Sequence, residues 1–232
     1  MIYLTGDTHG SSARFTNPEY RSLTEKDYVI VCGDFGMIFS PEVPDAQETK
    51  EFEVLDTLPF QVLFVDGNHE NFTRLNSYPV EMWNGGKSHR ISNNVRHLMR
   101  GQIFTIESRK IFTFGGAEST DKHLRIPNIS WWEEEMPSMA EYEEGLDNLE
   151  KHGHAVDYIL THDLPAHLVI KFSRYYRANL LHKYLEEVDS SCSFAHWYCG
   201  HHHVDMDLTD RHTILFNALV PLGQDILHRL DV

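Results

Sequence analysis

The stretch YVIVCGDFG, residues 28–36, joins an unbroken β-rich run to a glycine and an aspartate. Two more runs near the start of the chain have the same form: Ile2–Leu4 leads into TGDTHG, and Val62–Val65 leads into DGNHE. Continuous apolar runs of this length are typical of strands that are buried on both faces of a sheet. A helix is expected between the second and third runs, from Asp45 to Leu58, so this part of the chain predicts an α/β arrangement.

The rest of the chain is richer in short strands. After the turn Asn84-Gly85-Gly86 we expect three consecutive strands in an antiparallel meander. These strands are Val95–Met99, Ile103–Glu107 and Ile111–Phe114. The later expected elements are helices at Ser138–His152 and Tyr176–Val188 and strands at Val156–Leu160, Ala195–Cys199, Val204–Leu208 and Thr213–Ala218. No repeat or linker interrupts the pattern, so one domain over residues 1–232 is predicted.

Composition limits the classes of function. Apolar residues make up 41% of the chain, which is enough for a packed core and excludes a disordered composition. A formal net charge of -15 argues against a broad basic surface for duplex nucleic acid. The cysteines are few and odd in number, and neither a signal-peptide pattern nor a membrane-spanning apolar run is visible, so a cytoplasmic protein is expected.

Polar clusters follow the apolar runs at their carboxyl ends, which is the edge of an open α/β sheet where ligands bind. Each cluster holds side chains that can bind metal, and a single cluster of this kind would be an ordinary turn or helix cap. The clusters are Asp7 with His9, Asp34, Asn68 with His69, His162, and the histidines from His201 to His203. Their joint appearance predicts a metal site.

The motifs GDTHG, GDFG, GNHE, a strand-end TH and GHHH, in this order, resemble the five motifs of the calcineurin-like metallophosphoesterase superfamily. The resemblance spans residues 6–203 and extends to the stand-alone phosphoesterases of bacteria and their phages. It implies an α/β fold in which two mixed β-sheets, flanked by helices, form a four-layer α/β/β/α sandwich. The residues alone support only the α/β beginning and the β-rich second half.

The resemblance also implies a role for each motif residue. The implied ligands of a first metal ion are Asp7, His9 and His203, and those of a second are Asn68, His162 and His201. Asp34 would bridge the two ions, and His69 would protonate the leaving oxygen as general acid. His202, between two ligands, should point away from the metals.

Physical chemistry supports the same reaction. Two divalent ions about 3.5–4 Å apart can hold the phosphoryl oxygens of an anionic ester and lower the pKa of a bridging water. The carboxylates of Asp7 and Asp34 offset only part of the metal charge, so the site stays positive. Oxygen and nitrogen ligands without thiolate favour Mn, Fe or Zn. We therefore expect hydrolysis of a phosphomonoester or phosphodiester by metal-bound hydroxide.

The second motif departs from the protein-phosphatase pattern GDxxDRG, because Met37 and Ile38 stand where that pattern has its second aspartate and its arginine. The sequence therefore does not support a Ser/Thr protein phosphatase. The carboxylate that usually orients the catalytic histidine is also missing, and the replacements considered are Asp66, Glu70 and Asp163. Arg14 and Arg74 are candidates to bind the phosphate, although an ordinary solvated arginine is the favoured interpretation of each.

Residues Phe114–Ser138, here called the flap segment, form a candidate substrate flap. Trp131 or Trp132 could stack on a base or sugar, but packing on the core is the favoured interpretation. Glu133–Glu135 is expected as a solvated surface or a helix start. The remaining histidines are expected to be structural or exposed: His89, His97, His123, His152, His154, His167, His182, His196, His212 and His228.

Two alternatives stay open at this point. A metallo-β-lactamase-type hydrolase would use His201, His203 and Asp205, but its next ligand position holds Met206. A catalytically inactive scaffold of the same fold is the other alternative, although every expected ligand position is filled. For the enzyme, a small phosphorylated molecule or nucleotide is the expected substrate, long duplex nucleic acid and membranes are not expected partners, and the oligomeric state is open.

Overall fold

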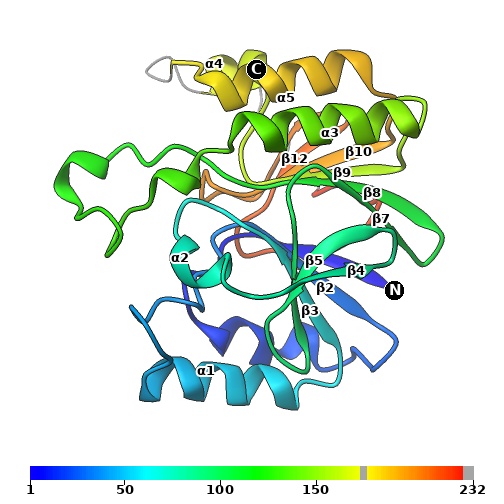
Figure 1. Ribbon diagram of the computed structural model, residues 1–232. Helices are drawn as coiled ribbons and strands as arrows, with labels where there is room; N and C mark the ends of the chain where they lie inside the picture. The colour runs from blue at the N-terminus through cyan, green and yellow to red at the C-terminus, as the bar shows by residue number, and fades with distance from the viewer. Residues whose placement is uncertain (173–176, 227–232) are drawn as a thin grey trace.

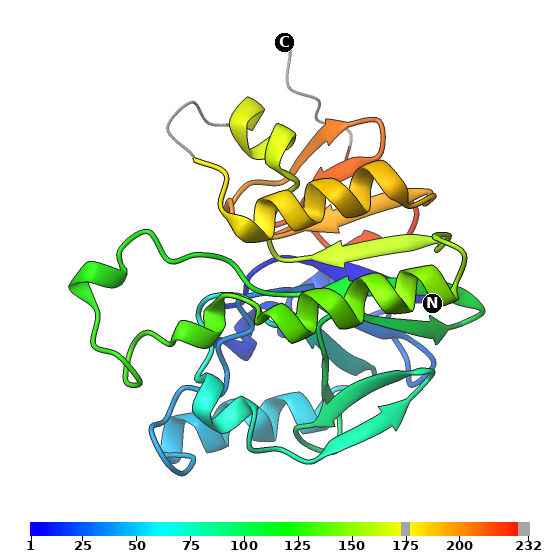
Figure 2. The same ribbon diagram turned by 45° about the horizontal axis from the view of Figure 1, so that its top comes forward.

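A computed structural model describes residues 1–172 and 177–226 of the protein. Two mixed β-sheets pack face to face, with α1 on the outer face of one and α3, α4 and α5 on the outer face of the other (Figure 1). The same layers are seen from a second direction in Figure 2. The predicted four-layer α/β/β/α sandwich is therefore confirmed.

Each sheet combines a parallel centre with antiparallel edges. The seven-stranded sheet has the spatial order β13 (Val220–Pro221), β1 (Ile2–Thr5), β2 (Tyr28–Cys32), β3 (Gln61–Val65), β6 (Val95–Leu98), β5 (Gly86–Arg90) and β4 (Val80–Trp83). The six-stranded sheet has the order β11 (Met206–Thr209), β12 (His212–Ile214), β10 (His196–Cys199), β9 (Tyr158–Thr161), β8 (Arg109–Phe114) and β7 (Gln102–Ile106). Strands β1, β2, β3 and β6 run parallel, and so do β8, β9, β10 and β12.

The helices are short, with 4 to 13 residues each. They are α1 (Ala46–Thr57), α2 (Phe72–Leu75), α3 (Met139–Lys151), α4 (Ala166–Phe172) and α5 (Leu180–Ser191). Single 3₁₀ turns are η1 (Ser12–Thr16), η2 (Pro18–Tyr20), η3 (Lys122–Leu124) and η4 (Glu133–Glu135). Over residues 1–172 and 177–226, none of these helices has both the length and the apolar character that a membrane crossing requires.

Strand β2 shows how the layers are filled. Val29 and Val31 pack in the layer that contains Leu55 of α1, whereas Ile30 and Cys32 pack between the sheets against residues of β7, β8, β9 and β10. Alternate side chains of a strand point to opposite faces, so an unbroken apolar run fits a strand that is covered on both faces. Full burial of each such side chain stabilises the fold by about 1.5–3 kcal/mol.

Capping residues in the sequence correctly predict where α1 and α3 begin. The Asp45 side chain accepts hydrogen bonds from the first turn of α1, and Ser138 forms the expected capping box with Glu141 at the start of α3. Both predicted helices are confirmed. The helix expected from Tyr176 begins outside the described residues, and the observed α5 starts at Leu180 because the Asn179 side chain caps it.

The expected antiparallel meander is wrong. Strand β6 pairs with β3 in the first sheet, whereas β7 and β8 form a hairpin in the second sheet, so the chain changes sheets near Gly101. The hairpin of β4 and β5 was not expected, although its turn has positive φ at Asn84 (47°) and Gly85 (97°), as a two-residue hairpin turn requires. The strand expected at Thr213–Ala218 ends early, because β12 stops at Ile214. The next strand, β13, was not expected and pairs with β1 in the other sheet. Apolar alternation identifies a strand but not its partner.

A buried ion pair joins α1 to α2. Arg74 Nη2 lies 2.6 Å from Glu48 Oε1, and Arg74 Nη1 donates to Glu48 Oε2 at 2.7 Å and to the Ser40 carbonyl at 3.1 Å. Glu48 is fully buried, and its Oε2 also accepts a hydrogen bond from the Ser40 backbone amide at 2.8 Å. Arg74 is thus used to hold the loop before α1, and its placement does not support the phosphate-binding role considered from the sequence.

We predict that Arg74→Ala destabilises the protein by about 3–5 kcal/mol, because it leaves a buried carboxylate without its cation. Glu48→Gln should have a comparable effect, and the double variant Arg74→Met/Glu48→Leu should recover part of the loss. Urea unfolding followed by circular dichroism measures these free energies. A loss below about 1 kcal/mol for Arg74→Ala would show that the pair contributes no more than an exposed one.

Candidate metal centre

The predicted site residues converge at one edge of the molecule. Strand β1 begins near the N-terminus at the right of Figure 1, so the carboxyl ends of its parallel neighbours lie at the opposite edge, where the flap segment projects. The loop residues at this edge are Asp7 and His9 after β1, Asp34 after β2, Asn68 and His69 after β3, His162 after β9, and His201 and His203 after β10. Both sheets therefore contribute to one site.

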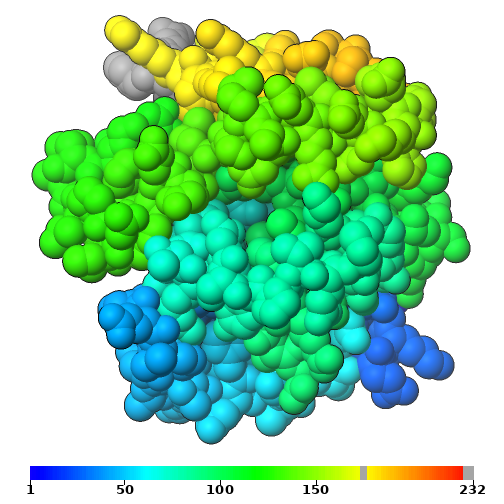
Figure 3. Space-filling view, in the orientation of Figure 1, coloured from blue at the N-terminus to red at the C-terminus, as the bar shows by residue number. Residues whose placement is uncertain are grey.

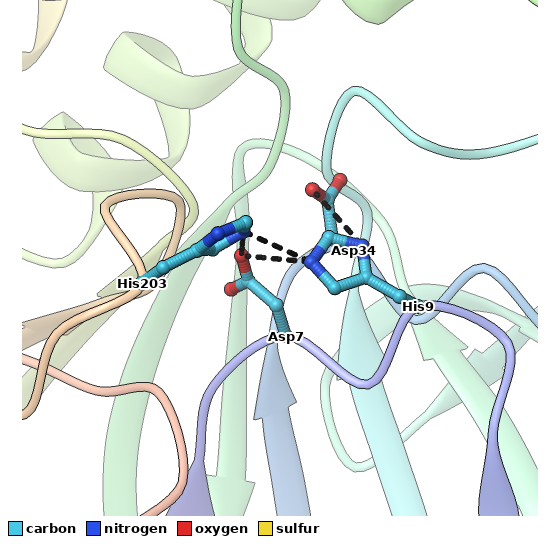
Figure 4. A group of neighbouring side chains, drawn as sticks. All are labelled: Asp7, His9, Asp34 and His203. Atoms are coloured by element: carbon cyan, nitrogen blue, oxygen red, sulfur yellow. Dashed lines mark hydrogen bonds and ion pairs between the residues drawn. The ribbon is translucent and has the colours of Figure 1, made fainter.

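A first group of ligand atoms comes from Asp7, His9, Asp34 and His203, all within 4.8 Å of one another (Figure 4). His9 Nε2 lies 2.9 Å from His203 Nε2, and His203 Nε2 lies 3.1 Å from Asp7 Oδ2. The ring nitrogens and the carboxylate oxygens thus face a common point, the arrangement that a cation with nitrogen and oxygen ligands needs.

A second group comes from Asp34, His162 and His201, again within 4.8 Å. His162 Nε2 lies 3.3 Å from Asp34 Oδ1 and 3.3 Å from Asn68 Oδ1, so the amide oxygen of Asn68 adjoins this group. Asp34 belongs to both groups, as a bridging ligand would. The assignment of each residue to a particular metal ion stays a prediction.

Burial shows that these residues fit divalent cations. Asp7 and Asp34 are 0% and 1% exposed, and Asp7 Oδ2 accepts no hydrogen bond within the described residues. Burial, together with the neighbouring Asp34 carboxylate, raises the pKa of Asp7. A buried carboxylate oxygen that accepts no hydrogen bond is costly, and a cation between the two carboxylates would remove that cost.

Asp34 is fixed by the loop that follows β3. Its Oδ1 accepts hydrogen bonds from the backbone amides of Asn68 and His69, both at 2.8 Å. Burial alone would raise the pKa of Asp34, but His162 and these hydrogen bonds lower it below its usual range. Burial correspondingly opposes the charge on His162, whereas Asp34 raises the pKa of His162 to about 10. A cation that binds His162 must displace this proton.

Four of the candidate ligands have a left-handed backbone conformation. The φ angles are 47° at His9, 46° at Asp34, 66° at His201 and 51° at His203. A non-glycine residue in this region costs on the order of 1–3 kcal/mol and persists where the surrounding structure enforces it, commonly at functional sites. The clustering of these conformations at one edge supports a functional centre there.

Two motif glycines make room for the ligands. A Cβ at Gly33 would lie 2.0 Å from His162 Nδ1, and a Cβ at Gly67 would lie 2.1 Å from Asp34 Oδ1. Both distances are far below van der Waals contact. The glycines of GDFG and GNHE are therefore required because a ligand from another strand packs directly against each backbone.

The flap segment orients Asn68, a contact that the sequence did not predict. Asn68 Nδ2 donates to Ser119 Oγ at 3.1 Å, and Ser119 Oγ donates to Glu135 Oε2 at 2.6 Å. With its nitrogen held in this way, the amide turns its oxygen towards His162. Glu133–Glu135, expected as a solvated surface or a helix start, forms the 3₁₀ turn η4, and Glu135 is only 1% exposed.

His69 lies between the metal centre and the flap segment. Its Nε2 is 3.9 Å from Asp34 Oδ2, and its Nδ1 is 3.1 Å from Arg125 Nη1. Burial and, to a lesser extent, Arg125 lower the pKa of His69, against the opposite influence of Asp34. The three carboxylates considered as its partner bind elsewhere: Asp66 binds Arg100, Glu70 accepts from backbone amides after β2, and Asp163 binds His182.

Arg14 has a structural position rather than a phosphate-binding one. Its Nη1 donates to the carbonyls of Gly6 at 2.7 Å and Phe216 at 2.6 Å, and its Nη2 donates to the carbonyl of Asp7 at 2.6 Å. These bonds hold the ligand loop after β1 against the chain after β12. The terminal guanidinium nitrogens of Arg14 and Arg74 already donate to groups of the protein, so neither arginine is supported as a substrate residue.

The remaining predictions concern packing. Trp132 is buried in the core and donates through Nε1 to Thr73 at 2.9 Å, which confirms its packing role, and Trp131 is half-buried. His202 turns away from both ligand groups: its side chain is 2% exposed, packs against the Phe172 ring and lies 3.4 Å from Asp163. Among the described residues, none of the histidines expected to be structural or exposed joins a ligand group, and His228 lies outside the described residues.

We predict unequal effects within the triple histidine. His203→Ala should lower the content of tightly bound metal, because its Nε2 faces Asp7 and His9. His202→Thr should keep the metal and lose about 1–3 kcal/mol of stability, since it removes buried packing against Phe172. Metal analysis after Mn loading, with thermal unfolding of the same samples, separates the two. A folded but metal-free His202 variant would contradict this division.

Comparison with known families agrees with the geometry. The family model described as calcineurin-like phosphoesterase matches residues 1–205, and no curated protein matches the chain. The β-lactamase-type alternative gains no support, because Asp205 accepts hydrogen bonds from the backbone amides of Phe216 and Ala218 instead of facing the ligand groups. Since the family model covers most of the sequence and every motif at the converging edge, the chain belongs to the calcineurin-like phosphoesterase family.

Proposed function

We propose that this protein hydrolyses phosphate esters with two divalent cations, held by the two ligand groups that share Asp34. The observation that carries the proposal is the placement of His69 directly beside these groups, 3.9 Å from the shared carboxylate. The donors are carboxylate oxygens, imidazole nitrogens and one amide oxygen, a set that favours Mn, Fe or Zn.

When bound, two such cations would hold the phosphoryl oxygens and lower the pKa of a coordinated water. His69 supplies a proton on the leaving-group side. Since Arg125 donates to His69 Nδ1, the ring proton of neutral His69 lies on Nε2, which faces Asp34 and the centre. To act as general acid, His69 must first gain a second proton at Nδ1, which displaces the Arg125 contact, and the imidazolium can then give its Nε2 proton to the leaving oxygen.

The substrate that we propose is a small phosphorylated molecule or nucleotide, either a monoester or a diester. The His9, His69 and His203 side chains are 37%, 35% and 52% exposed, so a small ester can reach the centre from solvent. A net charge of -15 disfavours a long duplex partner. The cytoplasmic location expected from the sequence stays a prediction.

The first experiment is an assay with added Mn that compares p-nitrophenyl phosphate, its bis-ester and a panel of nucleotides. We expect turnover of at least one of these substrate classes, and their ratio then separates a phosphatase from a phosphodiesterase. Metal content is measured on the same sample. Full metal loading without turnover of any ester would favour an inactive scaffold of the same fold.

We predict that His69→Ala retains metal but loses turnover by about 10²–10⁴-fold, because it removes the proton donor and no ligand. Asp34→Asn should lose both metal and turnover, since its carboxylate belongs to both ligand groups. His123→Ala, an exposed histidine of the flap segment, is the matched control and should resemble the wild type. Full metal occupancy in Asp34→Asn would overturn the bridging role of this carboxylate.

A further inference from the structure

Arg125 brings a positive charge to the mouth of the centre from a part of the chain that carries no family motif. It follows η3 in the flap segment, which stands out from the body of the molecule in Figure 3. Its guanidinium reaches back to His69 through the 3.1 Å contact between Nη1 and Nδ1. The flap segment fixes this geometry itself, because Arg125 Nη1 also donates to the Ser130 carbonyl at 3.2 Å.

The guanidinium keeps donors for another ligand. Its Nε pairs with Asp121 Oδ1 at 2.8 Å, and its Nη2 makes no hydrogen bond within residues 1–172 and 177–226. The Asp121 side chain is 47% exposed, so this ion pair contributes little and is readily exchanged for another anion. The arginines first considered differ in this respect, since Arg14 and Arg74 have committed their donors to carbonyls and to Glu48.

The position of Arg125 relative to His69 indicates which part of a substrate it would meet. His69 Nε2 faces the shared carboxylate Asp34, whereas Arg125 lies at the opposite ring nitrogen. The leaving oxygen would lie at Nε2, because that nitrogen gives up the proton. Arg125 would therefore lie beside the leaving group and away from the reacting phosphorus. Exposed apolar side chains flank it at Leu124 (78%) and Ile126 (58%), which suits an organic group carrying the anion.

We propose that Arg125 recognises a second phosphate on the leaving group, so that the preferred substrates are small bisphosphorylated molecules. The proposal rests on the proposed phosphoesterase function and specifies its substrate class. A guanidinium binds a phosphate through paired hydrogen bonds, and a charge-assisted pair of this kind is among the stronger polar interactions in proteins. The second motif of this protein has no arginine to bind phosphate. Arg125 would supply a cation, in this case for the leaving group.

The test compares matched substrates: adenosine 3′,5′-bisphosphate, adenosine 5′-monophosphate and p-nitrophenyl phosphate. Arg125→Gln should lower kcat/KM for the bisphosphate by about 10-fold or more beyond any change that it causes with the other two substrates, and this additional loss should appear chiefly in KM. Lys122→Gln is the control, because it also removes one positive charge from the flap segment, and among the described residues Lys122 pairs with Glu118. This control should leave all three substrates unaffected.

Binding without turnover gives an independent measurement. Calorimetry on the Mn-loaded His69→Ala protein should show bisphosphate binding that weakens by about 10-fold or more when Arg125→Gln is added. An equal loss of kcat for all three substrates would assign Arg125 to positioning His69 and overturn the proposal. Unchanged bisphosphate binding would overturn it as well. Failure of the proposed function differs from both, because the wild type would then bind bisphosphate without hydrolysing any ester.

Discussion

The site depends on how the buried carboxylate of Asp34 is stabilised. It is 1% exposed, belongs to both ligand groups, and accepts two backbone hydrogen bonds from the loop after β3. A buried anion in this position needs positive partners on several sides, which His162 provides in part and divalent cations would complete. The arrangement of the surrounding loops follows from meeting this requirement.

The two sheets meet that requirement through their parallel centres. Strands β1, β2 and β3 end together, and β9 and β10 end opposite them, so loops distant in sequence reach the same point. Where a ligand side chain packs against the backbone of another loop, that backbone position must be glycine. Gly33, against which His162 packs, is an example. Stability from the apolar layers offsets the strained backbone at the ligands, which explains why strands buried on both faces lie under the site.

The convergence of the motif residues is predictable from sequence because each one directly follows a strand with a strong apolar signal. The carboxyl ends of neighbouring parallel strands share an edge, so local pattern is enough to place Asp7, Asp34 and Asn68 together. Which strands pair is a long-range property. For that reason the sequence predicts β6 beside β7, whereas β6 pairs with β3. The role of an arginine is equally non-local: sequence proximity to a motif made Arg14 and Arg74 candidates for phosphate binding, whereas their burial and their hydrogen-bond partners show a structural role.

The roles of the flap segment follow from its tertiary contacts and could not be predicted from its local sequence pattern. Its residues carry no family motif, yet Ser119 orients the amide of Asn68 and Arg125 contacts His69. One segment therefore touches both a candidate metal ligand and the candidate proton donor, which are adjacent in the chain. A ligand that drew Arg125 away from His69 would change which hydrogen bonds His69 can make. The guanidinium that we propose as the phosphate-binding group is therefore also the one that contacts the candidate proton donor.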